Sequence, residues 1–228
     1  GGGPAIKLIN GATYNTFKNL YLLGNSASSA GGIINIANSN STYGIGNSYN
    51  VIAANTIGDS AALIRSYTAI YAYGDYSYPN TGNRIDGNYI INMGTLNGYG
   101  YGIYSYYYNN AVQIVRNTIT LTTVVGIPNI YGIYGLYYYN GYSTGSDTIA
   151  YNTIKDIRTT YDYCNQYGLF IYYFGYNAGT MSVSNNMITL TSGTYNYLYG
   201  MYLYSSNAAG VLNVDHNSVD LRGTTLSS

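Results

Sequence analysis

Ile114-Val-Arg-Asn117-Thr-Ile119 is the hexapeptide that decides the fold, because its pattern of apolar-x-x-Asn-x-apolar recurs along the whole chain. The copies are spaced by roughly 30 to 40 residues, a period typical of solenoid proteins. Their asparagines are Asn55, Asn88, Asn117, Asn152, Asn186 and Asn217, and Ala12-Thr-Tyr-Asn15-Thr-Phe17 is a degenerate seventh copy. The repeat predicts that each copy marks the same place in one structural unit.

A second motif, small-apolar-aromatic, precedes the Asn motif by roughly 15 to 20 residues. It is found at Ala69-Ile70-Tyr71, Gly102-Ile103-Tyr104, Gly132-Ile133-Tyr134, Gly168-Leu169-Phe170 and Gly200-Met201-Tyr202. Residues around it alternate with the period of two that is typical of β-strands, and amphipathic stretches with the helical period are absent. Each unit is therefore predicted to be a strand, a turn, a strand, an Asn bend, a strand and a variable loop.

These patterns predict an all-β fold: a right-handed parallel β-helix of about seven coils, in a single domain spanning residues 1–228. In such a solenoid, strands of adjacent coils pair in register about 4.8 Å apart, so equivalent side chains stack in columns. We expect the domain to be a segment of a longer rod or a filament subunit that stacks end to end, because the coil pattern runs without recognisable caps.

The composition limits the classes of partner. Only 7% of residues are charged, with 8 Lys and Arg balancing 8 acidic residues, whereas Tyr occurs 34 times and Gly 29 times. A neutral surface gives little attraction to a nucleic-acid backbone, so we expect no nucleic-acid partner. No apolar run approaches the roughly 18–20 residues of a transmembrane helix. The single cysteine, Cys164, excludes an internal disulfide framework and is expected to be buried.

The motif asparagines are predicted to be structural. Asn tolerates left-handed backbone better than other non-glycine residues, and its amide can bond to the Asn one coil away. We therefore expect a corner ladder of Asn15, Asn55, Asn88, Asn117, Asn152, Asn186 and Asn217.

The aromatic residues are predicted to form exposed columns on one sheet. One column would comprise Tyr71, Tyr104, Tyr134, Phe170 and Tyr202, and a second would comprise Tyr73, Tyr106, Tyr172 and Tyr204, interrupted by Leu136. Two compatible interpretations remain open. The rings stabilise the sheet by stacking, or they form a binding face for glycans, other surfaces or neighbouring rods.

Candidate catalytic residues are sparse. His216, the single histidine, lies beside Asp215, but no nucleophile motif accompanies it. The densest charged group is interpreted as solvated ion pairs; it comprises Lys155, Asp156, Arg158 and Asp162. There is no Cys/His cluster for zinc and no acidic loop repeat for calcium. Asn40-Ser41-Thr42 matches the glycosylation sequon, which carries little weight by itself. We expect no catalysis, no metal and no cofactor.

The Gly-Ile-Tyr strand followed by Ile-x-x-Asn-x-Ile resembles the parallel β-helix repeats of the pectate-lyase-like superfamily, over nearly the whole chain. The stretch Gly3-Pro-Ala-Ile-Lys-Leu-Ile-Asn-Gly-Ala-Thr-Tyr-Asn-Thr-Phe-Lys-Asn-Leu20 is similar more specifically to β-helical segments of large secreted surface proteins of Bacteroidota. The resemblance implies export, an extracellular or cell-surface location and an adhesive or scaffolding role. The same fold also carries lyases and hydrolases, so the fold alone does not decide the function.

The function favoured by the sequence is a non-catalytic, extracellular structural or adhesive rod that self-associates end to end or laterally, or that binds glycans or surfaces. One alternative is a glycan-binding module that uses the tyrosine columns. A further alternative is a polysaccharide lyase or hydrolase, whose acids would come from the few Asp residues.

Overall fold

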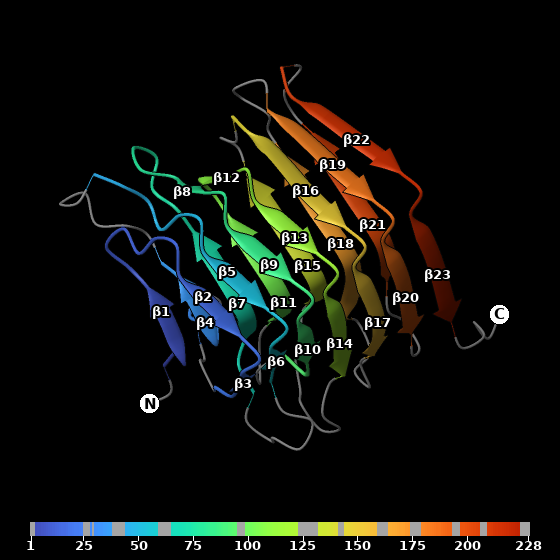
Figure 1. The fold of residues 1–228 in the computed structure, drawn as a ribbon. Coiled ribbons are helices and arrows are strands. Elements are labelled where there is room, and N and C mark those ends of the chain that lie inside the picture. The colour runs from blue at the N-terminus through green and yellow to red at the C-terminus, as the bar shows by residue number, and fades with distance from the viewer. Residues whose placement is uncertain are drawn as a thin grey trace.

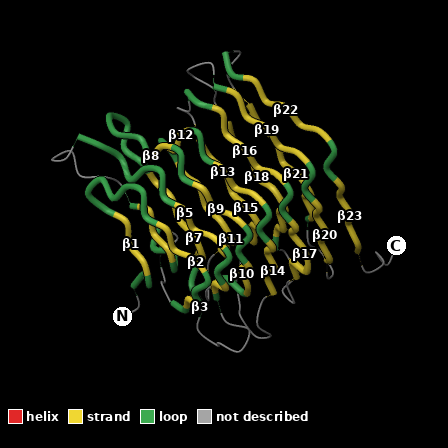
Figure 2. Tube along the Cα trace, in the orientation of Figure 1, coloured by secondary structure: helices red, strands yellow, loops and turns green. Residues whose placement is uncertain are grey.

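The structure, a computed structural model, is an all-β parallel solenoid, which confirms the predicted fold class (Figure 1). It describes residues 3–24, 28, 30–37, 44–58, 65–94, 99–122, 132–140, 144–158, 164–173, 179–192, 197–205 and 209–223. Within these ranges no helix is present, and short loops join the strands at the corners (Figure 2).

Three main sheets run along the solenoid, and each contains seven strands paired in parallel. Sheet A comprises β1 (Ile6–Leu8), β4 (Ile34–Ile36), β7 (Thr68–Tyr73), β11 (Tyr99–Tyr106), β15 (Gly132–Asn140), β18 (Asn165–Tyr173) and β21 (Leu198–Ser205). Sheet B comprises β2 (Thr16–Lys18), β5 (Val51–Ala53), β9 (Arg84–Asp86), β13 (Gln113–Val115), β16 (Ser146–Ala150), β19 (Thr180–Ser184) and β22 (Val211–Asp215). Sheet C comprises β3 (Tyr21–Leu22), β6 (Thr56–Ile57), β10 (Tyr89–Ile91), β14 (Thr118–Thr122), β17 (Thr153–Arg158), β20 (Met187–Ser192) and β23 (Ser218–Gly223). A small extra sheet pairs β8 (Asn80–Thr81) with β12 (Asn109–Asn110).

The solenoid is most regular from β7 onward. Its sheet A strands there are 6 to 9 residues long, whereas β1 and β4 have 3 residues each. The fully developed part is therefore about five turns, somewhat fewer than the predicted seven coils.

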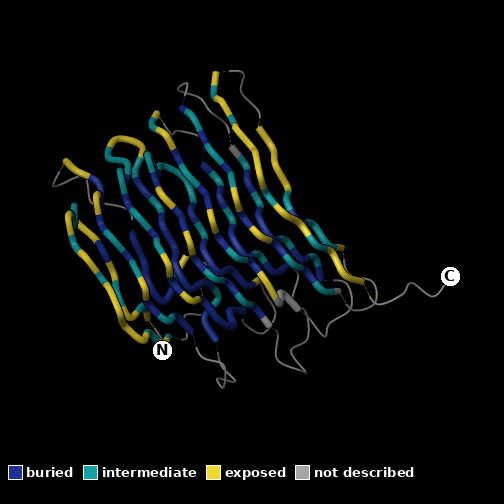
Figure 3. Tube along the Cα trace, turned by 45° about the vertical axis from the view of Figure 1, so that its right-hand side comes forward, coloured by how far each residue is buried: buried dark blue, intermediate teal, exposed yellow. Residues whose placement is uncertain are grey.

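Buried residues line the inner coils of the solenoid, dark blue in Figure 3, and aliphatic side chains make up most of this core. In sheet C, one column is at most 1% exposed and is in register from strand to strand; it comprises Ile57, Ile90, Ile119, Ile154 and Ile188. Burying such a side chain contributes about 1.5–3 kcal/mol relative to its exposed state. The motif's second apolar position is therefore a core position in these five repeats, whereas Val219, at the same position of the last repeat, is 44% exposed.

At the corner between sheets B and C one residue per coil has a left-handed backbone conformation, but it is not the predicted asparagine. The residue before each ladder asparagine has a φ between 49° and 62°; these residues are Ala54, Gly87, Arg116, Tyr151, Asn185 and His216. The asparagine itself is not the left-handed residue, which corrects the expected reason for its presence. Its side chain is turned inward, where an amide can bond to neighbouring coils.

Candidate functional site

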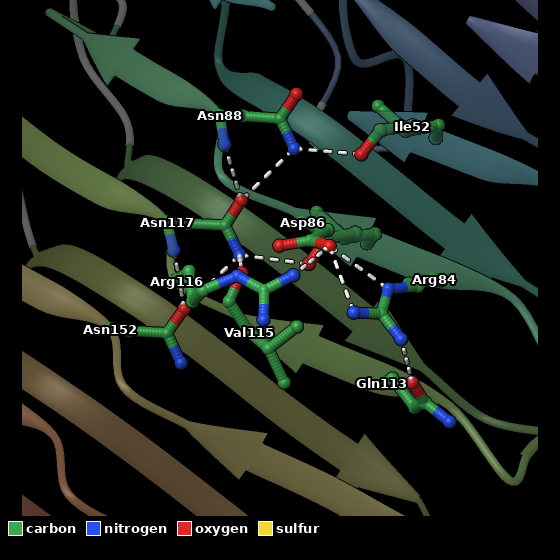
Figure 4. Close-up of polar contacts among 10 residues, drawn as sticks. Ile52, Arg84, Asp86, Asn88, Gln113, Val115, Arg116, Asn117 and Asn152 are labelled. Carbon is green, nitrogen blue, oxygen red and sulfur yellow. Dashed lines mark hydrogen bonds and ion pairs between the residues drawn. The ribbon is translucent and has the colours of Figure 1, made fainter. Parts of the chain in front are cut away.

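The asparagine ladder holds successive coils together inside the corner (Figure 4). Asn88 shows the pattern: its backbone N–H and its Nδ2 both donate to Oδ1 of Asn117, at 3.0 and 2.9 Å, and Nδ2 also donates to the carbonyl of Ile52 at 2.9 Å. The same contacts repeat through Asn55, Asn88, Asn117, Asn152, Asn186 and Asn217. All but Asn217 are 1% exposed. The ladder is thus a continuous buried network, as predicted for these six residues.

Asn15 does not belong to this ladder. In the first coil the equivalent position is Leu20, whose N–H donates to Oδ1 of Asn55 at 3.0 Å. Asn15 instead donates to Oδ1 of Asn50, because β2 pairs with β5 so that Phe17 lies beside Ile52. The predicted seventh copy of the motif was therefore wrong: Phe17 is equivalent to Ile52, the apolar residue before the motif asparagine, and not to Ile57, the one after it.

Two further asparagine ladders went unrecognised in the sequence. Asn50 donates to Oδ1 of Asn83, and Asn47 donates its N–H to Oδ1 of Asn80 at 3.0 Å. A signal for them exists, because Asn47-Ser-Tyr-Asn50 and Asn80-Thr-Gly-Asn83 repeat the pattern Asn-x-x-Asn. The register places Asp147 at the level of Asn83, and its carboxylate accepts hydrogen bonds from the Val112 N–H at 2.9 Å and from the Tyr138 hydroxyl at 2.6 Å.

The acidic residues of the described chain are engaged in local contacts. Asp86 accepts from Arg84 at 3.0 Å and also pairs with Arg116, while Arg84 donates to Gln113 (Figure 4). Both arginines are more than a third exposed, so these pairs contribute little to stability. Asp215 pairs with His216 at 3.0 Å, and in the ranges that the structure covers no three His, Cys, Asp or Glu residues gather in a way that suits a metal ion. The side chains of Asp156, Arg158 and Asp162, and the sequon at 40–42, lie outside the described residues.

Cys164 is buried, as expected. Its thiol lies close enough to Tyr134 to contribute to the raised pKa of that phenol. The expected structural role of Cys164 therefore fits its place in the core.

The outer side of sheet A carries three aromatic columns, which together we call the aromatic face. The first is Tyr71, Tyr104, Tyr137, Phe170 and Tyr202, and the second is Tyr73, Tyr106, Tyr139, Tyr172 and Tyr204. The third, which the sequence did not reveal, is Tyr101, Tyr134, Tyr167 and Tyr199.

Two predicted details of the columns are wrong. Tyr134 lies in the third column, because Leu136 and not Ile133 is in register with Ile103 and Leu169. Leu136 is completely buried and does not interrupt the second column, where Tyr139 occupies the place assigned to it. The chain contains two successive triplets of the small-apolar-aromatic motif, Gly132-Ile-Tyr and Gly135-Leu-Tyr. The prediction used the first, but the second is the one in register with Gly102-Ile-Tyr.

The rings of the aromatic face cover one another. Toward the C-terminus they are parallel, with centroid distances of 4.6 Å for Tyr134–Tyr167, 4.7 Å for Phe170–Tyr202 and 4.4 Å for Tyr172–Tyr204. Each such pair contributes about 0.5–1.5 kcal/mol beyond its buried area. Toward the N-terminus the first column meets edge to face instead, with planes 77° apart for Tyr71–Tyr104 and 72° apart for Tyr104–Tyr137. Where the rings are parallel, ring faces meet along the column, so few of them are left free.

The aromatic face is also less exposed than predicted. Tyr71 is only 8% exposed, whereas Tyr202 and Tyr204 on the last strand are 39% and 41% exposed. Burial, together with neighbouring phenols, raises the pKa of Tyr137 to about 12. The pKa values of Tyr101 and Tyr104 are raised further for the same reason, since a phenolate loses its hydration there.

These pKa shifts predict an alkaline unfolding transition. An unfolded tyrosine ionises near pH 10, and a folded-state pKa above that value means that the stabilisation is complete below about pH 10 and is lost as the pH rises through the folded pKa. We expect phenolate absorbance to show a class of tyrosines that ionises only above about pH 12, together with loss of the β-sheet circular dichroism. In urea all tyrosines should ionise as one class.

A variant tests the cause. Tyr137→Phe keeps the ring that stacks on Phe170 at 4.6 Å but removes an ionisable hydroxyl. Its stability should fall less steeply than that of the parent between about pH 10 and 12. A parent protein that ionises all its tyrosines near pH 10 while staying folded would contradict the burial of the face.

Comparison with known proteins finds a similar fold but no matching sequence family. No protein-family model and no curated protein matches the chain. A solved structure with similar architecture is that of the Streptococcus pneumoniae surface protein and adhesin PfbA, with a TM-score of 0.53 and 15% sequence identity. The match covers 98% of this chain and 62% of that one, so this chain spans less than two thirds of the length of PfbA. Among the residues that the structure describes, no helix has the length and hydropathy to cross a membrane.

Proposed function

We propose that this chain is a non-catalytic segment of an extracellular surface rod, and that the aromatic face is the surface through which it adheres. The observation that carries the proposal is the aromatic face itself. Its three columns run across β11, β15, β18 and β21 with an unbroken register. Stacking fixes the rings, so the hydroxyls form a rigid array that needs little ordering when a partner binds.

The engagement of the acidic side chains supports a non-catalytic role. A glycoside hydrolase needs two carboxyl groups facing each other across a substrate, and a lyase needs an acidic metal site with a base. Asp86 is held by two arginines and Asp220 is held by Arg222. Asp147 is buried in the core at 1% exposure. None of these arrangements offers a pair of carboxylates to a polymer.

The surface location is supported by fold and composition. A protein of similar architecture is a bacterial surface protein and adhesin. At 15% sequence identity this likeness shows a shared fold and not a shared function. A neutral chain with 8 basic and 8 acidic residues has little electrostatic repulsion to prevent close contact with other surfaces or with further copies of itself.

The geometry favours glycosylated surfaces that are bound through hydrogen bonds. Where the rings of a column are stacked, each ring face is covered by the next ring, so sugars cannot lie flat on it. The tyrosine hydroxyls donate and accept hydrogen bonds, as sugar hydroxyls do. Adhesion and glycan binding are thus one function in this proposal. The tyrosine hydroxyls, and not the ring faces, would contact the glycans.

The test removes hydroxyls but keeps rings. A triple variant, Tyr106→Phe, Tyr139→Phe and Tyr172→Phe, changes three successive strands of the second column. We expect it to lose most of its retention on a mucin-coated sensor in a quartz-crystal microbalance, with thermal unfolding largely unchanged. The matched control replaces Tyr21, Tyr89 and Tyr151, which are 61%, 44% and 62% exposed outside the aromatic face, with Phe, and should keep its retention.

Two results would count against this function. One is equal retention of the triple variant and the control. The other is release of reducing sugar from pectin or alginate by the parent protein, which would favour the enzymatic alternative. Sedimentation velocity on the same three proteins would register self-association, and a loss confined to the triple variant would identify the aromatic face as the contact between rods.

A further inference from the structure

An interior corner of the solenoid holds two tyrosines of adjacent coils against each other. Tyr107 follows β11, at the corner between sheets A and B, and Tyr139 lies in β15 of the next coil. The Tyr107 N–H donates to the Tyr139 carbonyl at 2.8 Å, and the Tyr107 hydroxyl donates to the Tyr139 hydroxyl at 3.1 Å. Further coils flank the pair on both sides. The two residues are thus tied together at the backbone and again at the ends of their side chains.

The two rings converge toward their hydroxyl ends. Their centroids are 4.8 Å apart, whereas their hydroxyl oxygens are 3.1 Å apart. The ring carbons ortho to each hydroxyl flank the oxygen, so this convergence brings an ortho carbon of one ring close to an ortho carbon of the other. A dityrosine bond joins these two carbons and leaves the hydroxyls side by side next to it. The pair therefore already has the hydroxyl arrangement of a coupled product.

The stacked pairs of the aromatic face are less suited to such a bond, although their rings are as close. Tyr172 and Tyr204 lie 4.4 Å apart with planes 15° apart, on residues directly opposite in register. A bond between ring carbons lies in the planes of both rings, so coupled rings end edge to edge. Residues opposite each other on strands about 4.8 Å apart cannot reach that arrangement unless the strands separate. Tyr107 is offset by one residue from Tyr106, the register partner of Tyr139, and its ring is perpendicular to that of Tyr139, at 88°.

The corner backbone that positions Tyr107 is held by a buried amide. Tyr107 and Tyr108 have φ values of 22° and 54°, which large side chains rarely adopt. Asn109 is 1% exposed, and its Nδ2 donates to the carbonyls of Tyr106 at 2.8 Å and Tyr107 at 3.2 Å. Backbone strain of this kind persists only where the surroundings determine it, as they do at many functional sites. The amide of Asn109 thus holds the conformation that brings the Tyr107 ring to Tyr139.

The pair is partly accessible from solution. Both side chains are half-buried, so a dissolved oxidant can reach them, while other rings cover part of each: Tyr106 lies 4.3 Å from Tyr107, and Tyr172 lies 4.7 Å from Tyr139. Such cover favours coupling within the pair over coupling to another molecule. Burial, followed by the hydrogen bond to Tyr139, raises the pKa of Tyr107, so its oxidation at neutral pH removes a proton together with the electron.

We propose that Tyr107 and Tyr139 form an oxidative cross-linking site, at which a haem peroxidase with hydrogen peroxide joins adjacent coils through a dityrosine bond. Each tyrosine loses one electron and its hydroxyl proton, and the peroxide takes up both electrons and both protons to give two molecules of water. The two phenoxyl radicals combine through their ortho carbons. Each of these carbons then passes its hydrogen to the oxygen of its own ring, which restores both phenols. The site does not depend on adhesion by the aromatic face.

The test treats dilute protein with a haem peroxidase and hydrogen peroxide. We expect a monomer that has lost the mass of two hydrogens, emits the blue fluorescence of dityrosine and yields a mapped peptide joining Tyr107 to Tyr139. Tyr107→Phe keeps the ring but cannot form a phenoxyl radical, so it should lose most of the fluorescence. Tyr108→Phe is the matched control, because it removes a hydroxyl from the same positive-φ corner, and it should keep the yield of the parent.

Unfolding gives a second measurement. A cross-link between residues 32 positions apart restricts the unfolded chain, so the treated parent should unfold at a higher urea concentration than the untreated one. Treatment should not shift Tyr107→Phe. The proposal is overturned if the parent forms no dityrosine, if the mapped bond joins other tyrosines, if the two variants lose fluorescence equally, or if the product consists mainly of joined molecules.

Discussion

Asn117→Ala is expected to lower the free energy of unfolding by about 3 kcal/mol or more, enough to unfold much of a marginally stable domain. Asn117 Oδ1 accepts from the N–H and Nδ2 of Asn88, and its Nδ2 donates to Asn152 Oδ1 and to the carbonyls of Ile85 and Val115. Alanine leaves both Asn88 donors buried without this acceptor. Urea denaturation followed by circular dichroism measures the change.

The matched control is the last member of the ladder. Asn217 also accepts from Asn186, but it is only half-buried, so water can replace the lost contacts. Asn217→Ala should therefore cost about 1 kcal/mol. Equal effects at the two positions would mean that the ladder is not the buried network described above.

Gly102→Ala is expected to be comparably severe, for a steric reason. A Cβ at Gly102 would lie 2.4 Å from the carbonyl oxygen of Gly135 and 2.7 Å from Ile119 Cγ2. Neither neighbour can move easily, since one is backbone of the adjacent strand and the other belongs to the fully buried isoleucine column. Overpacking of this kind costs about 3 kcal/mol or more when the surroundings are rigid. Thermal unfolding should shift strongly downward, and expression as soluble protein should fall.

Gly87→Ala separates sterics from backbone conformation. Gly87 has φ 62°, but a Cβ there would meet no atom within 4 Å. Its substitution should cost only the left-handed penalty of about 1–2 kcal/mol. If Gly102→Ala were no worse than Gly87→Ala, the close packing of sheet A against sheet C at this glycine would be disproved.

The fold could be predicted from the sequence because each coil of a solenoid repeats the same short sequence motifs. The Asn motif has apolar residues at fixed offsets, so its position in each coil could be read without knowing the contacts. The six-membered ladder from Asn55 to Asn217 followed from this pattern. The long sheet A strands were likewise indicated by period-two alternation around Ile70, Ile103 and Met201.

The predictions that were wrong concern the register between strands, at places where two possible registers match the repeat about equally well. Asn15-Thr-Phe17 resembles Asn55-Thr-Ile57, yet pairing puts Phe17 beside Ile52. Gly132-Ile-Tyr134 resembles Gly102-Ile-Tyr104, yet Leu136 is the residue in register with Ile103. A shift of this kind is decided by which alternative fills the core along the whole column, and that depends on neighbouring coils.

The ladders also bear on how the molecule responds to mechanical load. Their hydrogen bonds run from coil to coil, along the axis of the solenoid. Tension applied at one end would act on one junction between coils at a time, so the rod would come apart in successive small steps. Tension spread over a side of the rod would be shared by many junctions at once. Resistance to force should therefore depend on where the molecule is gripped, and a pulling experiment with attachment points along one side should require much larger forces than one that pulls on the ends.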